Sequence, residues 1–174
     1  NGKRFRNSKT IYQGPKKFNG LGGLAIGPNG RLYGGVSLNQ KYDHQADPSK
    51  YGNSVISMTR TGKDVRVVST GLRQPWMLTF APGIRDPFVS VLGQDLPQNN
   101  GAPDLIVKAT PGADFGFPEC NWSNAQTCED FTEPFLKLDA QPGPKKSLNQ
   151  QSPMGIGAIG SKLYVALFGG TAKA

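Results

Sequence analysis

Three stretches of the chain repeat one pattern of apolar and polar positions. Each has a run of apolar and small residues, a turn with Gly or Pro, and a second run with an aliphatic or aromatic centre; they occupy residues 23–33, 76–91 and 154–166. Two short apolar runs on either side of such a turn are typical of a β-hairpin. The first turn contains Asn29 and Gly30, a strong hairpin signal. The sequence therefore predicts three similar hairpins.

The intervals between these hairpins contain further strand signals. Residues 54–58 and 65–69 flank a Thr-Gly-Lys-Asp turn, and residues 105–107 form another apolar run. A hairpin followed by outer strands, repeated at a spacing of ~50 residues, is typical of a β-propeller with four-stranded blades. We expect about three to four blades, with surface insertions near residues 40–51 and 141–151.

Composition supports the same fold class. The chain has 23 Gly and 14 Pro among 174 residues, well above the typical combined share of ~12%, which disfavours a helical bundle. The expected fold is all-β, with residues 1–174 forming a single propeller domain or part of one. An open arc of blades leaves unpaired strand edges. We therefore expect either a longer chain or an oligomer that closes the ring between chains.

The charge balance excludes little by itself. The chain carries 20 Lys and Arg against 12 Asp and Glu, a formal net charge of +8. It has no zinc-finger spacing, no aromatic-basic RNA motif and no basic helix, so we expect no nucleic-acid partner. No apolar run approaches the ~18 residues of a membrane span, so none is expected.

The two cysteines lie close together in a polar stretch. Metal binding would require further ligands near Cys120 and Cys128, and the sequence has none there. A disulfide that closes this loop is the favoured interpretation, and free thiols are the alternative. A disulfide implies an oxidising compartment, so we expect a secreted or periplasmic protein. Residues 121–123 also match the Asn-x-Ser glycosylation pattern.

Three motifs together resemble a known family. They are GLRQPWML at residues 71–78, DLIV at 104–107 with PGADFGFP at 111–118, and SPMGI at 152–156. They are similar to segments of the glucose/sorbosone dehydrogenase-like six-bladed β-propellers, which include soluble sugar dehydrogenases dependent on pyrroloquinoline quinone (PQQ). In order and approximate spacing, the motifs cover most of residues 20–168.

The resemblance implies a mechanism. In the catalytic members a His accepts the proton of a sugar hydroxyl while hydride passes to the quinone, an Arg stabilises the developing negative charge, and Ca²⁺ polarises the quinone. Arg73 matches the family's Arg. Gln74 stands where the family has Asn, and Trp76 replaces a Gln that contacts the cofactor. Trp76 has an alternative role as a packing residue between blades.

The family's base has no direct counterpart here. Its position falls on Asn19, whose amide cannot accept a proton at any relevant pH. The only imidazole is His44, inside an Asp-His-Gln tripeptide like that of the family but after the first hairpin instead of before it. His44 is the candidate base if a displaced loop brings it to the channel, and a solvated surface histidine is the alternative.

The resemblance also implies calcium, bound through backbone carbonyls of the loop that contains Gly93, Gln94 and Asp95. Carbonyl and carboxylate oxygens suit this hard cation, whereas the alternative interpretation of the stretch is simple turn chemistry.

These observations give two main functional hypotheses. The first is PQQ-dependent oxidation of a sugar or polyol hydroxyl, with Arg73 and His44 as catalytic residues and Asn19, Gln74 and Trp76 at the cofactor. The second is a non-catalytic propeller that binds a carbohydrate or a protein partner. A metal-dependent lactonase would need clustered acidic and amide ligands, which the sequence does not supply.

Overall fold

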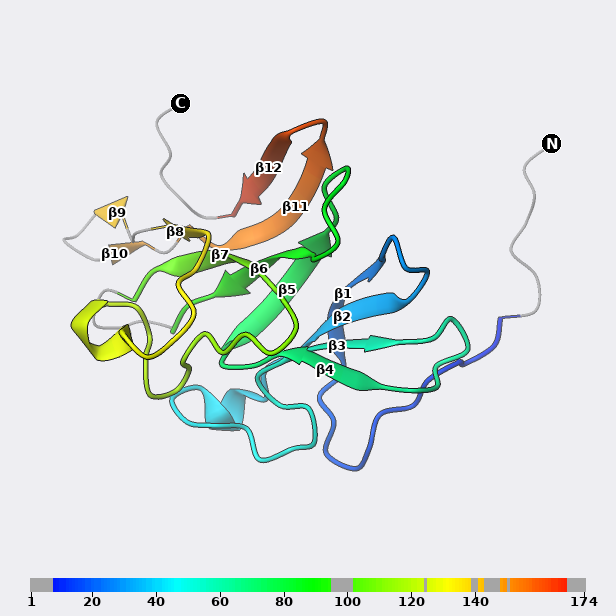
Figure 1. Cartoon of the computed structure of the whole chain (residues 1–174). Helices are drawn as coiled ribbons and strands as arrows, with labels where there is room; N and C mark the ends of the chain where they lie inside the picture. Colours follow the sequence, from blue (N-terminus) through cyan, green and yellow to red (C-terminus); the bar gives the residue numbers. More distant parts are fainter. Residues whose placement is uncertain are drawn as a thin grey trace.

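The computed structural model describes residues 8–94, 102–123, 125–138, 141–142, 148–149 and 151–168, and its regular structure is almost entirely β (Figure 1). The strands are β1 (Leu21–Ile26), β2 (Leu32–Val36), β3 (Val55–Met58), β4 (Arg66–Ser69), β5 (Gln74–Thr79), β6 (Phe88–Leu92), β7 (Asp104–Lys108), β8 (Leu136–Leu138), β9 (Gln141–Pro142), β10 (Leu148–Asn149), β11 (Pro153–Ile159) and β12 (Lys162–Leu167). Short 3-10 turns at Gln40–Tyr42 and Ala125–Cys128 are the helical elements of these ranges.

Each predicted hairpin forms the first two strands of a sheet. Strands β1–β4 and β5–β8 make two four-stranded antiparallel sheets in sequence order, and β11 pairs with β12. The registers are equivalent: Ala25 lies opposite Tyr33 in the first hairpin, and Leu78 lies opposite Val89 in the second. The all-β prediction and the repeated hairpins are therefore confirmed.

The sheets follow one another around their first strands. Strand β5 contacts β1 and β2 on one side and β11 on the other, so the first strands of successive sheets are neighbours. Figure 1 shows the sheets splayed outward from this line, with β4 and β8 away from it. This is the arrangement of consecutive propeller blades.

Glycines permit the close approach of the first two sheets. A Cβ at Gly23 in β1 would lie 2.9 Å from the Cα of Met77, and one at Gly35 in β2 would lie 2.5 Å from the carbonyl oxygen of Pro75. Backbone atoms cannot move away as a flexible side chain can, so these strands pack only because the positions lack side chains. The small residues of the repeated pattern therefore serve the contact between blades.

The main core lies between the two four-stranded sheets. Val55, Val89 and Val107 are fully buried there. Ile56, adjacent to Val55, faces the opposite side of the first sheet and packs in a second cluster with Phe18 of the segment that precedes β1. Successive residues of a strand point to opposite faces, so this sheet is covered on both sides.

The long connection from β7 to β8 also joins the two sheets. The N–H of Gly112 donates to the carbonyl of Val68 over 2.8 Å, and that of Phe115 donates to the carbonyl of Thr70 over 3.1 Å. This connection therefore runs beside the end of β4, and it places the Phe115 ring, 1% exposed, in the core between the sheets.

The two predicted insertions have different outcomes. Residues 40–51 form a loop that begins with a 3-10 turn and exposes most of its side chains, although Asp47 is buried. In residues 141–151, the short strands β9 and β10 pair, and most of the rest lies outside the described residues. Within the described ranges, the structure contains no helix that is both long and apolar enough to cross a membrane.

Candidate functional site

The topology brings most of the predicted site residues to one edge of the sheets. Leu21 at the start of β1 pairs with Val36 at the end of β2, and Gln74 at the start of β5 pairs with Leu92 at the end of β6. The connections that enter β1 and β5 and those that leave β2 and β6 therefore share this edge, here called the rim. The predicted residues in or beside these connections are Asn19, His44, Arg73, Gln74, Gly93 and Gln94.

Arg73 connects three segments at the rim. Its side chain is 4% exposed, and its Nε donates to Oδ1 of Asp43 over 2.8 Å, a bond that Nη2 reinforces. Its Nη1 donates to the carbonyls of Leu92 and Gly93. The guanidinium therefore holds the loop of residues 40–51 in place. It links this loop to the start of β5 and to the start of the connection that follows β6. A buried charge with this number of acceptors is well paired.

His44 is bonded at both ring nitrogens. Its Nε2 lies 2.9 Å from Oδ2 of Asp43, and its Nδ1 lies 3.0 Å from the side-chain nitrogen of Gln94. A carboxylate only accepts hydrogen bonds, so Nε2 carries the proton and the neutral ring accepts at Nδ1. The His44 side chain is 42% exposed.

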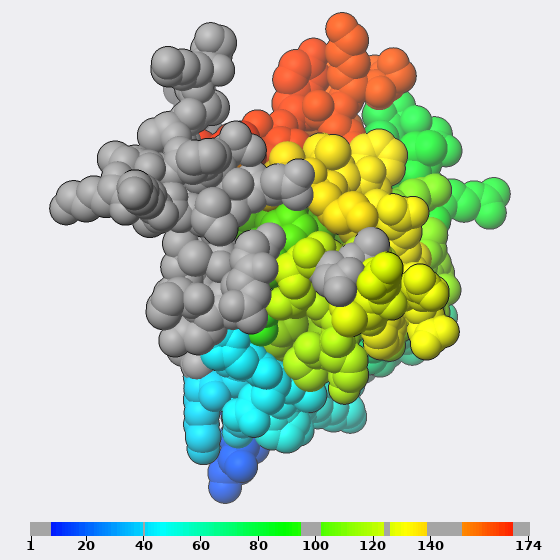
Figure 2. Space-filling model, turned by 90° about the vertical axis from the view of Figure 1, so that its left-hand side faces the viewer, coloured from blue at the N-terminus to red at the C-terminus, as the bar shows by residue number. Residues whose placement is uncertain are grey.

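Asn121 completes a chain of hydrogen bonds across the rim. Its Nδ2 donates to Oε1 of Gln94 over 2.7 Å, and the chain then continues through His44 and Asp43 to Arg73. We call these five residues the rim network. Figure 2 shows in cyan the loop of residues 40–51, which contributes two of them, next to the yellow-green connection that contributes Asn121.

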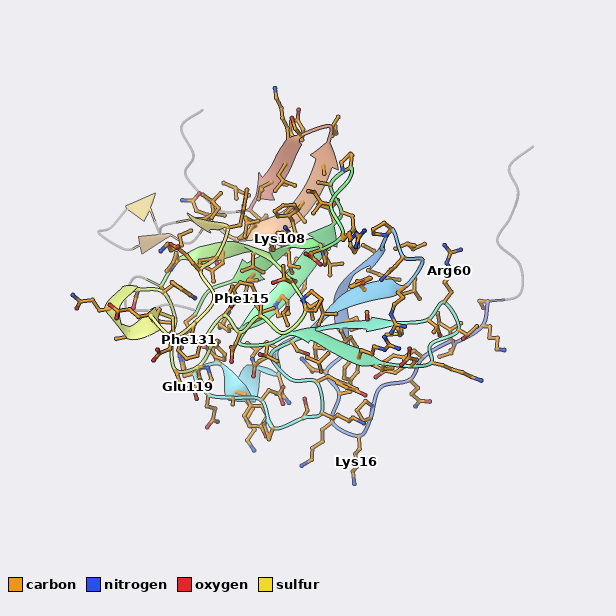
Figure 3. The ribbon with its side chains drawn as sticks, in the orientation of Figure 1. Lys16, Arg60, Lys108, Phe115, Glu119 and Phe131 are labelled. Carbon is orange, nitrogen blue, oxygen red and sulfur yellow. A yellow bond between two sulfur atoms is a disulfide. The ribbon has the colours of Figure 1, made fainter. Side chains whose placement is uncertain are left out.

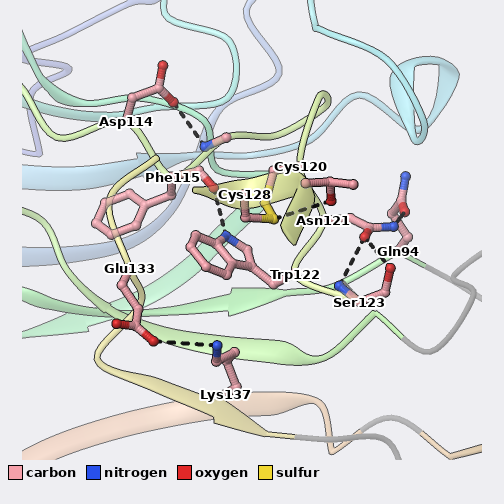
Figure 4. Close-up of a disulfide and its surroundings, with 12 residues drawn as sticks. Gln94, Asp114, Phe115, Cys120, Asn121, Trp122, Ser123, Cys128, Glu133 and Lys137 are labelled. Atoms are coloured by element: carbon pink, nitrogen blue, oxygen red, sulfur yellow. Dashed lines mark hydrogen bonds and ion pairs between the residues drawn. A yellow bond between two sulfur atoms is a disulfide. The ribbon is translucent and has the colours of Figure 1, made fainter. Parts of the chain in front are cut away.

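The disulfide fixes the segment that presents Asn121. Cys120 and Cys128 are bonded, with their Cα atoms 5.3 Å apart, which confirms the predicted pairing. Trp122 is buried, and its Nε1 donates to the carbonyl of Phe115 over 2.8 Å (Figure 4). The Oδ1 of Asn121 accepts from the backbone N–H and the hydroxyl of Ser123. The glycosylation pattern thus coincides with an asparagine whose side chain is already bonded.

A small cavity lies beside the rim network. It measures about 20 Å³, and Arg73, Gln94, Asn121, Phe115 and Trp122 contribute to its lining. A single water requires about 10–15 Å³ in this measure, so the cavity holds a water and no larger ligand.

Asp104 is a second buried acid at the rim. Its carboxylate is 1% exposed and accepts from the backbone N–H groups of Gly93 over 2.7 Å and Ser152 over 2.8 Å. Burial raises the pKa of Asp104 above its ordinary value, although these bonds and the charge of Arg73 act in the opposite direction. The residue ties the second sheet to the segment that leads into β11.

The fold matches that of solved sugar dehydrogenases. The PQQ-bound aldose sugar dehydrogenase of Streptomyces coelicolor superposes with a TM-score of 0.58 at 20% identity, over 84% of this chain and 42% of its own. An oxidoreductase described as a glucose dehydrogenase, from Thermus thermophilus, gives 0.60 at 21% identity, over 90% and 47% of the two chains. This chain has a sugar-dehydrogenase-type β-propeller fold. It spans less than half the length of either neighbour.

No family model matches the propeller sequence, and no curated protein matches it. The fold likeness therefore rests on the structural comparison and on the equivalent places of the three hairpins.

Three predicted residues of the propeller lie outside the rim network. Asn19 is exposed and donates to the carbonyl of Leu38 at the end of β2. Gln74 and Trp76 are half-buried near the start of β5. A role for any of the three at a cofactor stays a prediction.

Calcium at the predicted loop stays a prediction, although one of its expected ligands is already engaged. The carbonyl of Gly93 already accepts from the Arg73 guanidinium, so a divalent cation there would face a positive charge. The Gln94 side chain bonds to His44 and Asn121, and Asp95 lies outside the described residues. Among the residues that are described, no group of three His, Cys, Asp or Glu side chains is placed to hold a metal.

The same residues enclose little space for a quinone. A cofactor pocket usually measures about 300–1,000 Å³, far more than the 20 Å³ beside Arg73. Quinone binding by this chain stays a prediction.

Asp43 and Asn121 belong to the rim network but were not predicted as site residues. In the sequence Asp43 is part of a tripeptide, and Asn121 is part of a glycosylation pattern. No local signal links Asn121 to Gln94, because that contact depends on the path of the connection after β7.

Proposed function

We propose that this protein is a sugar dehydrogenase-like propeller that oxidises a hydroxyl group of a sugar or polyol. The observation that supports it is the Asp43–His44 pair, hydrogen-bonded at 2.9 Å and anchored by the buried Arg73. A carboxylate that holds one nitrogen of a histidine leaves the other nitrogen as a defined proton acceptor.

In this proposal each residue of the rim network has its own task. The substrate hydroxyl replaces the Gln94 amide as the donor to Nδ1 of His44 and transfers its proton there, and the carbon that bears the oxygen loses a hydride. Asp43 fixes the tautomer and stabilises the imidazolium that forms. Arg73 is a positioning residue, because its guanidinium is 4% exposed and bonded to Asp43. Stabilisation of developing negative charge by Arg73 stays a prediction.

The hydride acceptor in the proposal is a quinone with calcium. PQQ is bound in the Streptomyces structure, and such a quinone supplies a two-electron acceptor. Since the described residues enclose little space for it, this part of the proposal rests on the fold likeness and the sequence motifs. We also propose a secreted or periplasmic location, which the disulfide supports.

Particular observations favour a second candidate, a non-catalytic propeller that binds a carbohydrate or a protein partner. Asn19 stands at the position of the family's base, and the Gly93 carbonyl is bonded to Arg73. A propeller that lost catalytic activity but kept its rim residues would show both features.

Reconstitution separates the two candidates. The protein is mixed with PQQ and Ca²⁺, quinone binding is followed by its absorption spectrum, and dye reduction is measured with a panel of aldoses and polyols. The dehydrogenase proposal requires activity that falls at least about 100-fold in His44→Ala, the usual contribution of a general base. Gln45→Ala, at an exposed neighbour in the same loop, is the matched control and should retain activity.

Spectral titration without any quinone binding, or activity that survives in His44→Ala, contradicts the proposal. In the first case calorimetry with the same sugars tests carbohydrate binding by the non-catalytic propeller.

A further inference from the structure

A second pocket lies on the outer side of the loop of residues 40–51. It measures about 270 Å³, between this loop and the segment that precedes β1; the residues used below are Lys17, Asn39, Lys41, Tyr42, Asp47 and Ser49. We call it the lysine pocket. Since one water occupies ~30 Å³ of liquid, the pocket has the volume of several water molecules and accommodates a ligand larger than a simple ion. It is separate from the cavity beside Arg73, with which it shares no lining residue.

The charge of the lysine pocket is positive. Two cationic residues, Lys17 and Lys41, and one acidic residue, Asp47, are among those that line it. Oδ1 of Asp47 already accepts from the backbone N–H of Ser49 over 2.8 Å. Within the described part of the chain, neither lysine lies within ion-pair distance of an acidic side chain. Two cations facing one engaged carboxylate favour a ligand with a negative charge.

The remaining walls suit a sugar ring. Tyr42 supplies an aromatic side chain, and Nζ of Lys41 lies 5.8 Å from the centre of its ring. Oδ1 of Asn39 accepts from the backbone N–H of Lys41, so the amide N–H₂ is the group of Asn39 that can donate to a ligand.

We propose that the lysine pocket binds an acidic monosaccharide, a sugar ring that carries a carboxylate. Lys17 and Lys41 bind the carboxylate, Asn39 binds a ring hydroxyl, and Tyr42 contacts the apolar face of the ring. This inference goes beyond the proposed oxidation and needs neither quinone nor calcium. Because Tyr42 precedes Asp43, a ligand in the pocket lies on the same loop that carries His44.

Calorimetric titration of the full chain without PQQ tests the proposal. The probes are glucuronate, glucose and inorganic sulfate. We expect glucuronate to bind, glucose to bind at least about tenfold more weakly, and sulfate to bind weakly without displacing glucuronate at equal concentration. Loss of one ammonium in Lys17→Gln or Lys41→Gln should raise the Kd for glucuronate about tenfold.

The matched control is Lys16→Gln, which removes an exposed ammonium that is not part of the lining (Figure 3). Its Kd for glucuronate should equal that of the unaltered chain, and far-UV circular dichroism checks that each variant is folded. No glucuronate binding at millimolar concentration overturns the proposal, and so does an equal effect of Lys16→Gln and Lys41→Gln. Equal competition by sulfate overturns the sugar assignment, because it shows an anion site only.

These outcomes are distinct from failure of the dehydrogenase proposal. Binding of glucuronate is measured in the absence of quinone, and the Lys variants leave Asp43, His44 and Arg73 intact.

Discussion

Asp43 and Arg73, which are 30 positions apart in the sequence, form a hydrogen-bonded ion pair with an Nε–Oδ1 distance of 2.8 Å. The pair joins the loop between β2 and β3 to the start of β5, and so it connects the first two sheets. Because the other carboxylate oxygen of Asp43 accepts from His44, one carboxylate both secures the loop and orients the ring.

Asp43→Asn should destabilise the protein. The substitution leaves the Arg73 guanidinium buried without its counter-charge and turns an amide N–H₂ toward Nε2–H of His44 or toward Arg73. Loss of one partner of a buried pair costs about 3 kcal/mol of unfolding free energy. Urea unfolding measures this change. Asp130→Asn, at an exposed carboxylate, is the control, and an equal effect in the two variants contradicts a structural role for the pair.

Gly35→Ala should weaken the contact between the first two sheets. The new methyl group would lie 2.5 Å from the carbonyl oxygen of Pro75, and the resulting backbone shift costs about 1–3 kcal/mol. Gly157→Ala is the matched control, because a Cβ at this strand position meets no atom within 4 Å. It should leave stability unchanged or raise it by up to ~1 kcal/mol. Thermal unfolding of both variants compares them directly, and similar losses at the two positions would refute the packing argument.

Asp104 should make stability decrease with pH over a limited range. Burial raises the pKa of its carboxyl in the folded protein above the unfolded value of ~3.9. The folded state therefore binds more protons between these two values, and this contribution to stability is lost as the pH rises through the folded pKa. The contribution of Asp104 is measured as the difference in unfolding free energy between the unaltered chain and Asp104→Asn at each pH. A difference that grows with pH over this range would contradict the raised pKa.

Asp64 should have the opposite effect, so that its contribution to stability rises with pH. Hydrogen bonds from Arg66 and Arg31 lower the pKa of this exposed carboxyl. The stabilisation is present above the ordinary pKa and is lost as the pH falls through the lowered value. Carboxyl NMR titration should place the pKa of Asp64 below ~3.9 and move it upward in Arg66→Gln. No change in that variant would exclude Arg66 as the cause.

The disulfide should stabilise the loop that carries Asn121. Cys120 and Cys128 are separated by 8 positions, and closing a loop of this size is worth about 2.5 kcal/mol in the chain-entropy description. The double variant Cys120→Ala/Cys128→Ala should show this loss in urea unfolding. A reducing agent should destabilise the unaltered chain and leave the double variant unchanged; a reductant effect on the variant would point to another cause.

Local pattern was sufficient to predict strands β1–β7, β11 and β12, but it did not predict the short strands β8–β10. In the hairpin around Asn29 and Gly30, turn chemistry and apolar alternation act within a few residues, so the sequence predicts the hairpin. The same holds for the pairing of Cys120 with Cys128, whose short separation already brings the thiols together. The position of Gly35 against Pro75, by contrast, joins two sheets and is not specified by the local pattern.

The candidate site was less predictable, because its contacts join segments that are distant in the sequence. The motifs placed Arg73 in the site, but its partner Asp43 and the carbonyl of Gly93 were decided by how the sheets pack. The bond from Asn121 to Gln94 likewise depends on the connection after β7 lying beside β4. The sequence by itself determined the strands of the three hairpins, their turns and the disulfide, since these depend on near neighbours along the chain. Only the tertiary structure decided which polar side chains share the rim, because hydrogen bonding there depends on distances in space that the order of residues does not encode.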